Sequence, residues 1–256
     1  MTYAWMPGPE QPNTEIQMLK GQAVCGAAVG ILVLDLWYPY MPGNVANAST
    51  YKFPVLFKIL KGTTVPQILN ADPSLLAMIV EGGNELAQQG ARAIVGACGY
   101  FGHFQKEASQ KLKVPTFLSS MLQAPTIIRA LKPKQKLGVI CGSGPHLKPS
   151  LLTQCGIEDL SRVIIEGAAE QCVEFNQISN CTGHFVSNKI EKELVGIAKK
   201  LVSKNPEVGA ILLECSDMPP YAWAIQNAVR LPVFDFITMI NWIYDAVVRK
   251  PFAGFV

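Results

Sequence analysis

The fold is decided by two stretches of sequence, AIVGAC at residues 93–98 and AILLEC at residues 210–215. They match at an offset of 117 residues, and each stretch ends in a cysteine. The match continues without a gap into a Pro-x-Phe segment, which lies at 115–117 in the first copy and at 232–234 in the second. Self-similarity at one fixed offset indicates two copies of one structural unit.

The apolar runs around these stretches are short and continuous, which is typical of strands buried on both faces of a parallel sheet. Longer segments with helical periodicity separate them, and this alternation predicts an α/β protein. The expected strands are Val29–Leu34, Ala93–Ala97, Val114–Leu118, Leu137–Cys141, Val163–Glu166, Ala210–Leu213 and Val233–Phe234. The expected helices are Pro73–Gln89, Gly102–Leu112, Met121–Leu131, Pro149–Cys155, Asn188–Ser203, Met218–Val229 and Ile237–Arg249.

A segment rich in Pro, Gly and Asn, from Trp37 to Phe57, follows the first expected strand. In a parallel sheet this position opens onto the ligand crevice at the carboxyl ends of the strands. Asn47 and Thr50 are therefore candidate ligands for a substrate carboxylate. The alternative for both is ordinary turn chemistry, which Asn, Ser and Thr favour in any loop.

Composition limits the classes of function. Hydrophobic residues make up 49% of the 256 and charged residues 16%, as in a well-buried globular protein. The net charge of +3 is spread without a block of Lys or Arg, so we expect no nucleic-acid partner. The seven cysteines are odd in number and show no paired metal-ligand spacing, which argues against a disulfide scaffold and a zinc site.

No targeting signal stands out at the start of the chain, where residues 1–22 are interpreted as a surface extension. The apolar run from Ala23 to Leu36 contains two glycines and an aspartate and is too short to span a bilayer. We therefore expect a cytoplasmic protein with no membrane partner. The sequence leaves the oligomeric state open, a homodimer included.

Cys98 and Cys215 each follow a strand and precede a helical segment, where backbone N–H groups and the helix dipole favour a thiolate. If the two units face each other about a pseudo-two-fold axis, both thiols reach one cleft from opposite sides. A base on one face of a carbon and an acid on the other suit the inversion of a stereocentre. Asp217 is expected either to raise the pKa of Cys215 or to cap the following helix.

The segments ACGYFG at 97–102, VPTFLSS at 114–120 and LECSDMPPYA at 213–222 resemble the aspartate/glutamate racemase superfamily, as does Gly138-Val139-Ile140. The resemblance covers nearly the whole chain from about residue 25. It implies two similar Rossmann-like α/β lobes with parallel sheets and an active site in the cleft between them. It also implies that the strand after each cysteine crosses into the opposite lobe, so that residues 1–115 with 230–256 form the first lobe and residues 116–229 the second.

Several neighbours of the cysteines are candidate substrate-binding residues. The set comprises Gly99, Tyr100, Ser119, Ser120, Ser216 and Asp217. The serines after the 114–118 strand also suit a helix cap. The bulky Tyr100 differs from the small polar residues that the resemblance implies for amino-acid racemases, which leaves the substrate open.

The sequence thus predicts a cofactor-independent racemase or epimerase acting beside the carboxylate of a small amino-acid-like substrate. Cys98 and Cys215 are its expected acid/base pair, and no metal or organic cofactor is expected. Two alternatives remain. One is an isomerase or lyase of the same fold, like maleate isomerase or arylmalonate decarboxylase. The other is a binding protein that closes two lobes on a small ligand without chemistry.

Overall fold

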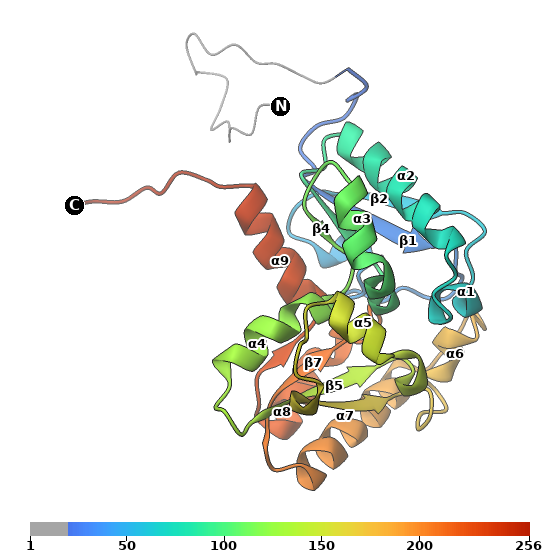
Figure 1. The fold of residues 1–256 in the computed structure, drawn as a ribbon, viewed down its shortest axis with the longest axis vertical. Coiled ribbons are helices and arrows are strands. Elements are labelled where there is room, and N and C mark those ends of the chain that lie inside the picture. Colours follow the sequence, from blue (N-terminus) through green and yellow to red (C-terminus); the bar gives the residue numbers. More distant parts are fainter. Residues whose placement is uncertain (1–19) are drawn as a thin grey trace.

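The computed structural model describes residues 20–256 and contains two four-stranded parallel sheets (Figure 1). The first has the order β2-β1-β3-β4 and the second the order β6-β5-β7-β8, so the strands correspond one to one. The first sheet consists of β1 (Val29–Leu34), β2 (Val55–Leu60), β3 (Ala93–Gly96) and β4 (Thr116–Phe117). The second consists of β5 (Lys136–Cys141), β6 (Val163–Gly167), β7 (Val208–Leu213) and β8 (Val233–Phe234). The predicted repeat and the α/β class are confirmed.

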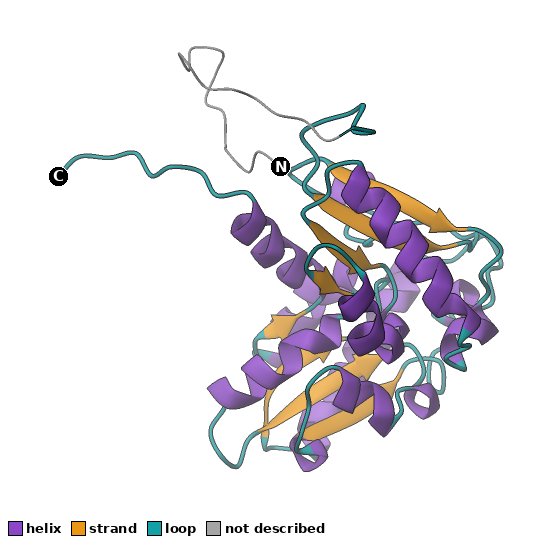
Figure 2. Cartoon of the chain, turned by 45° about the horizontal axis from the view of Figure 1, so that its top comes forward, coloured by secondary structure: helices purple, strands orange, loops and turns teal. Residues whose placement is uncertain are grey.

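Helices cover the two sheets and fill the space between them (Figure 2). The longest are α2 (Ser74–Gln88) and α7 (Ser187–Lys204), which pack on the first and second sheet respectively. The others are α1 (Val65–Leu69), α3 (Gln105–Lys111), α4 (Ala124–Ala130), α5 (Pro149–Gln154), α6 (Asn176–Ser179), α8 (Ala222–Val229) and α9 (Phe236–Val247). Every residue of β1 and β7 is buried, which accounts for their unbroken apolar sequences.

Strand β2 lies partly in the segment that the sequence analysis interpreted as a loop ending at Phe57. It pairs with β1 over its whole length, from Val55 beside Val29 to Leu60 beside Leu34. All but Leu60 are partly exposed or exposed, because β2 is an edge strand. A half-exposed strand that includes Lys58 lacks the continuous apolar signal by which the central strands were predicted.

The expected crossing of the strand after each cysteine into the opposite lobe is wrong. Strand β4 pairs with β3, which carries Cys98 at its end, and β8 likewise pairs with β7. The chain therefore crosses after these strands, a few residues later than the predicted boundaries at 115 and 230. Helix α9 does return to the first lobe, where its apolar face packs with β1 and β3 residues.

Helix α9 begins with an intact cap, since Asp235 accepts a hydrogen bond from the Thr238 N–H at 2.8 Å. Its apolar face buries Phe236, Met239 and Ile243. Within residues 20–256, no helix is long and apolar enough to cross a membrane. The interpretation of residues 1–22 falls almost entirely outside the described part of the chain.

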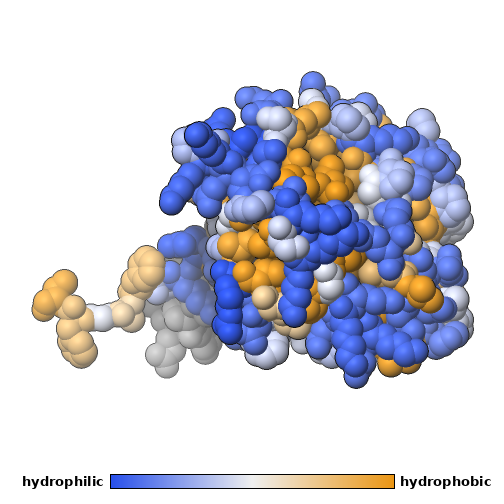
Figure 3. All heavy atoms as spheres, turned by 90° about the horizontal axis from the view of Figure 1, so that it is seen from below, coloured by the Kyte–Doolittle hydropathy of each residue, from blue (hydrophilic) through white to orange (hydrophobic). Residues whose placement is uncertain are grey.

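Apolar side chains also reach the surface. Figure 3 shows apolar patches between hydrophilic ones on the face seen from below. Trp223 and Trp242 are exposed, and Phe252 and Phe255 lie in the extended C-terminal segment. Nothing in the described residues shows what covers these side chains, and the homodimer remains a prediction.

Replacing Phe236 by Ala is expected to destabilise the protein by about 3–5 kcal/mol, because the ring is fully buried where α9 meets the first sheet. Denaturant unfolding followed by circular dichroism measures this change. Phe252→Ala is the matched control, since its ring is 93% exposed, and it should change the free energy of unfolding by about 0.5 kcal/mol or less. Equal effects of the two variants would contradict the docking of α9.

Candidate active site

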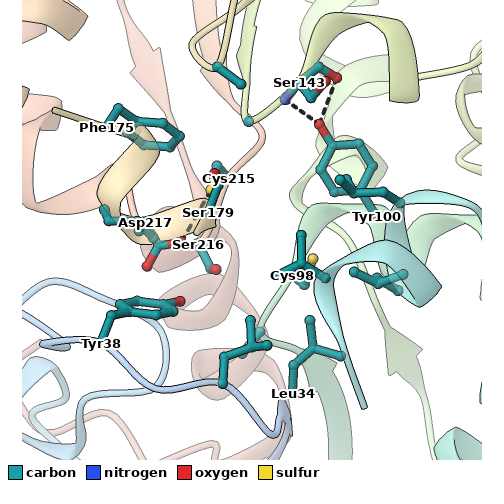
Figure 4. A pocket seen from close by; sticks show the side chains of 18 of the residues that line it. Leu34, Tyr38, Cys98, Tyr100, Ser143, Phe175, Ser179, Cys215, Ser216 and Asp217 are labelled. Atoms are coloured by element: carbon teal, nitrogen blue, oxygen red, sulfur yellow. Dashed lines mark hydrogen bonds between the residues drawn. The ribbon is translucent and has the colours of Figure 1, made fainter. Parts of the chain in front are cut away.

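A cavity of about 320 Å³ lies between the lobes, and both Cys98 and Cys215 line it. In Figure 4 the two cysteines project from opposite walls, Cys98 beside Tyr100 and Cys215 beside Asp217. A second hollow, of about 570 Å³ beside Trp242, contains no cysteine, histidine or carboxylate. The cavity between the lobes is therefore the candidate active site.

Each thiol stands at the carboxyl end of a central strand. Cys98 follows β3 and precedes a 3-10 turn over Gly99–Phe104, and Cys215 follows β7 and precedes a similar turn over Pro219–Tyr221. The equivalent strands of the two sheets thus bring the cysteines to one space. The predicted meeting of the two thiols at the interface of the lobes has its structural basis here.

The expected depression of the thiol pKa values is wrong. Burial, followed by the charge of Glu214, raises the pKa of Cys98 well above its ordinary value. Burial, followed by the charges of Asp217 and Glu214, does the same for Cys215. A short 3-10 turn follows Cys98 directly, and another begins four residues after Cys215. The N–H groups of Tyr100 and Phe101 beside Cys98 do not offset the burial. Both cysteines rest as thiols.

Asp217 is the centre of a buried hydrogen-bond network. One of its oxygens accepts from the Asn44 amide, and the other accepts from the Cys215 thiol at 3.4 Å. The hydroxyl of Tyr38 also hydrogen-bonds the carboxylate. Burial raises the pKa of Asp217, and these three donors lower it. The expectation that Asp217 raises the pKa of Cys215 agrees with this arrangement.

The opposite wall is fixed by Tyr100. Its hydroxyl accepts from the N–H of Ser143 at 2.6 Å and donates to the carbonyl oxygen of Ser143 at 2.8 Å (Figure 4). The Ser143 side chain in turn donates to Glu170 at 2.8 Å and lies 2.9 Å from Nδ1 of His146. This network ties the turn after Cys98 to the turn after β5 in the other lobe.

The lining of the cavity is aromatic, apolar and acidic. The rings of Tyr38 and Tyr40 lie 4.5 Å apart between centroids, and Tyr100 and Phe175 add two more rings. Asp217 contributes a carboxylate, whereas none of the described residues that line the cavity is Lys or Arg. The polar donors among them include Ser143, Ser179, Asn180 and Ser216. Aromatic faces beside a carboxylate favour a cation with apolar substituents.

The predicted site residues divide into two groups. Cys98, Tyr100, Cys215, Ser216 and Asp217 line the cavity. Those that lie outside it are Asn47, Thr50, Gly99, Ser119 and Ser120.

Asn47 and Thr50 belong to the framework of their loop. Asn47 donates to the Tyr40 carbonyl oxygen at 2.7 Å, and Thr50 donates to the Asn44 carbonyl oxygen at 2.8 Å. Both contacts hold the loop in the shape that brings Tyr38, Tyr40 and Asn44 into the cavity.

Ser119 and Ser120 are fully buried behind the cavity. Ser119 caps the turn that follows it, as the alternative interpretation expected. Ser120 donates to the carbonyl oxygens of Leu213 and Glu214 at 3.1 and 3.2 Å, which ties the chain after β4 to the end of β7. Gly99 packs against the side chain of Glu214.

Sequence reasoning missed Tyr38, Asn44, Phe175 and Glu214. Two of them, Tyr38 and Asn44, lie in the Pro/Gly-rich loop that was predicted to face the crevice. The loop was therefore predicted correctly, but the residues chosen from it were the wrong ones. Phe175 had no signal in the sequence. Glu214 stands next to Cys215, and an acidic residue at the end of a buried strand was the available signal.

Solved structures with this arrangement share low sequence identity with the chain. A glutamate racemase from Bacillus anthracis superimposes with a TM-score of 0.55 at 15% identity, over 87% of this chain and 84% of that one. An aspartate racemase from Picrophilus torridus gives 0.55 at 17% identity, over 89% and 96%. An arylmalonate decarboxylase gives 0.55 at 12% identity, over 87% and 94%. The fold is that of the aspartate/glutamate racemases.

Curated relatives point to different chemistry. The chain is 29% identical over 238 residues to dimethylsulfoniopropionate lyase 3 of Emiliania huxleyi, matching 89% of this chain and 61% of that protein. It is 26% identical over 258 residues to a dimethylsulfoniopropionate lyase of Durusdinium sp. clade D, matching 98% and 83%. The chain thus spans about three fifths of the length of the first relative. No family model matches the sequence.

The expectation of a racemase, and of the isomerase class, is overturned by these relatives, which are lyases. The physical reason is that two opposed thiols specify the removal of a proton but not the fate of the carbanion. Return of a proton gives a racemase, whereas loss of a group from the next carbon gives a lyase. Among residues 20–256 no cluster of three His, Cys, Asp or Glu could hold a metal ion, and the absence of cofactors remains a prediction.

Asp217→Asn is expected to lower the pKa of Cys215, because the substitution removes a buried like charge beside the thiol. Alkylation of Cys215 by iodoacetamide across a pH series, read by peptide mass spectrometry, measures the midpoint. Asp159→Asn, which changes an exposed carboxylate, is the control. An unchanged midpoint in Asp217→Asn would show that the charge of Asp217 does not contribute to the pKa of Cys215.

Gly99→Ala is expected to destabilise the protein by about 1–3 kcal/mol through overpacking. A Cβ at Gly99 would lie 2.0 Å from Oε1 and 2.5 Å from the carbonyl oxygen of Glu214. Gly196→Ala is the matched control, because nothing lies within 4 Å of that position in α7 and Ala favours a helix by about 0.5–1 kcal/mol. The midpoint of thermal unfolding should therefore fall in Gly99→Ala and rise in Gly196→Ala. An unchanged midpoint in Gly99→Ala would contradict the close contact with Glu214.

Proposed function

We propose that the chain is a lyase that cleaves dimethylsulfoniopropionate into acrylate and dimethyl sulfide. The observation that carries the proposal is the lining of the cavity, where two thiols share a space with aromatic rings and a carboxylate, and where none of the described lining residues is Lys or Arg. The similarity to dimethylsulfoniopropionate lyases over 89–98% of the chain supports the same substrate. The first relative is longer than this chain. That this chain has the activity of the whole relative is therefore part of the proposal.

The reaction is a β-elimination, and it balances without an oxidant or reductant. A thiolate removes a proton from the carbon beside the substrate carboxylate. The electron pair of that C–H bond forms the C=C bond of acrylate. The C–S bond breaks, and its electron pair stays on sulfur, so the sulfonium leaves as neutral dimethyl sulfide. The cysteine, now a thiol, returns its proton to solvent.

The sulfonium group fits the aromatic and acidic side of the cavity. Tyr38, Tyr40 and Phe175 offer ring faces, and Asp217 offers a negative charge. Cations over such rings are stabilised by about 0.5–2 kcal/mol, the larger values applying to desolvated sites. The methyl groups of the sulfonium also bury apolar surface against the rings.

The cation also accounts for how a resting thiol becomes a base. Burial and the nearby carboxyl groups raise the pKa values of Cys98 and Cys215, which keeps both protonated in the empty cavity. A sulfonium bound beside them adds a positive charge in a desolvated space, which lowers the pKa of a nearby thiol. Substrate binding thus creates the thiolate where the α-hydrogen lies.

The substrate carboxylate needs hydrogen-bond donors, since the described residues of the cavity include no Lys or Arg. Ser216 and Ser179 project into the cavity near Cys215 (Figure 4), and Asn180 adds an amide. These neutral donors hold the carboxylate without cancelling the negative potential that the sulfonium requires.

Incubation of the purified chain with dimethylsulfoniopropionate is expected to release dimethyl sulfide and acrylate in equal amounts, as measured by gas chromatography and proton NMR. Replacing the cysteine that acts as base by Ala should lower kcat about 100-fold or more. Cys98→Ala and Cys215→Ala are both tested, with the exposed Cys25 replaced as control. Near-normal turnover in both variants, or no product with the wild type, would overturn the proposal.

Two isosteric inhibitors test the cation site. 3-(Trimethylammonio)propanoate, which has a cationic head group, should inhibit about tenfold or more better than 4,4-dimethylpentanoate, which has carbon in place of that nitrogen, a difference of about 1.4 kcal/mol. Tyr38→Leu should narrow this preference, because it removes a ring from the cavity. Trp223→Leu, which changes an exposed ring outside the cavity, should leave it unchanged. Equal inhibition by the two compounds would count against a sulfonium substrate.

A further inference from the structure

The side chain of Glu214 is a buried carboxyl group that the proposed reaction does not use. It follows the last residue of β7 and immediately precedes Cys215. The side chain is fully buried, and it is not among the residues that line the cavity. Its Oε2 accepts a hydrogen bond from the N–H of Gly142 at 3.2 Å, and its Oε1 has no hydrogen-bond partner among the described residues.

This carboxyl lies against the turn that carries the other cysteine. Oε1 stands 2.0 Å from the point where a side chain on Gly99 would place its Cβ, so only glycine leaves room for it beside Cys98. The main chain of Glu214 is also held, because its N–H donates to the Ile140 carbonyl oxygen and its own carbonyl oxygen accepts from Ser120. Glu214 therefore connects the turns of Cys98, Cys215 and Gly142 at once.

We infer that Glu214 is a positioning residue for both cysteines. Its carboxyl group lies neutral between the two turns. When this group ionises, its charge keeps the cysteines protonated, so that the thiolate needed for catalysis is lost. The inference goes beyond the proposed lyase activity and rests on it only for the kinetic readout. Glu214 does not touch the cavity, so it acts through the cysteines and not on the substrate.

Among the described residues, the titratable groups that act on Glu214 or are affected by its charge are cysteines, a tyrosine and an aspartate. Its charge acts on Cys98 and Tyr100 from the turn after β3, on Cys141 of β5 and on Cys155 after α5. Cys215 and Asp217 face it from its own turn. Burial raises the pKa of Glu214 to about 8, with Asp217 adding to the rise and the Gly142 N–H opposing it.

The direction of the kinetic effect follows from these contacts. Below pH about 8 the carboxyl is neutral and leaves the cysteines free to form a thiolate when a cation binds. Above that pH it carries a charge that raises the pKa values of both Cys98 and Cys215. Activity should therefore level off or fall above pH about 8, where a simple thiol base would continue to gain activity.

Glu214→Gln keeps the shape and the acceptor for Gly142 but cannot ionise. The ratio of kcat in Glu214→Gln to kcat in the wild type is expected to rise at least about threefold between pH 6.5 and pH 9. Glu158→Gln, which changes an exposed carboxylate, is the matched control and should give a flat ratio. A flat ratio in Glu214→Gln would overturn the inference.

A second readout does not depend on catalysis. A folded pKa of about 8, compared with the ordinary 4.5, means that the folded state holds a proton that the unfolded state has lost. This contribution to stability is complete below pH 4.5 and is lost as the pH rises to about 8. The wild-type Tm should therefore fall by several degrees more over this range than the Tm of Glu214→Gln, and Glu158→Gln should behave as the wild type.

If Glu214→Gln does not fold, infrared spectra of the wild-type chain still test the inference, because a protonated carboxyl band should titrate near pH 8. Absence of such a band, or identical pH slopes of Tm in all three proteins, would overturn it. A wild type that releases no dimethyl sulfide but shows the predicted pH dependence of stability would refute the lyase proposal alone.

Discussion

Two thiols share a cavity with the carboxylate of Asp217, and none of the described residues that line this cavity is Lys or Arg. This constraint governs the rest of the site. A thiolate formed there in the absence of substrate would face the Asp217 carboxylate at hydrogen-bond distance. Burial and this carboxylate both act against ionisation, and the proposed sulfonium substrate would bring the positive charge that offsets them. These electrostatics are the reason for proposing a cationic substrate.

The architecture meets this constraint by bringing the ends of equivalent strands together. Parallel strands present their carboxyl ends at one edge, and two sheets of the same order supply one cysteine each. The loop after β1 then reaches across to the second lobe, where the Val45 N–H donates to the Ser216 carbonyl oxygen at 3.3 Å. The same loop delivers Tyr38 and Asn44 to Asp217, so the carboxylate beside Cys215 is held by residues of the first lobe.

The sequence was informative wherever local pattern and burial coincide. The central strands and both cysteines could be predicted because a buried parallel strand is apolar throughout and the repeat fixes its partner. The orientation of individual side chains in a loop could not be predicted in this way. Asn44 and Asn47 lie three residues apart in the same segment, yet one reaches Asp217 and the other bonds Tyr40. Glu214 was missed for another reason, since a charged residue at a strand end suggests exposure to solvent, whereas here the side chain is buried against Gly99.

The two walls of the cavity are not equivalent, and this bears on why the fold supports more than one reaction. A racemase needs two thiols that exchange roles, because the proton returns from the face opposite to its removal. Here the Cys215 thiol donates to a carboxylate, whereas backbone N–H groups of Tyr100 and Phe101 lower the pKa of Cys98. An elimination needs one base only, since the sulfonium departs with the electron pair and no proton returns to carbon. A pair of thiols in unequal surroundings is thus sufficient for a lyase.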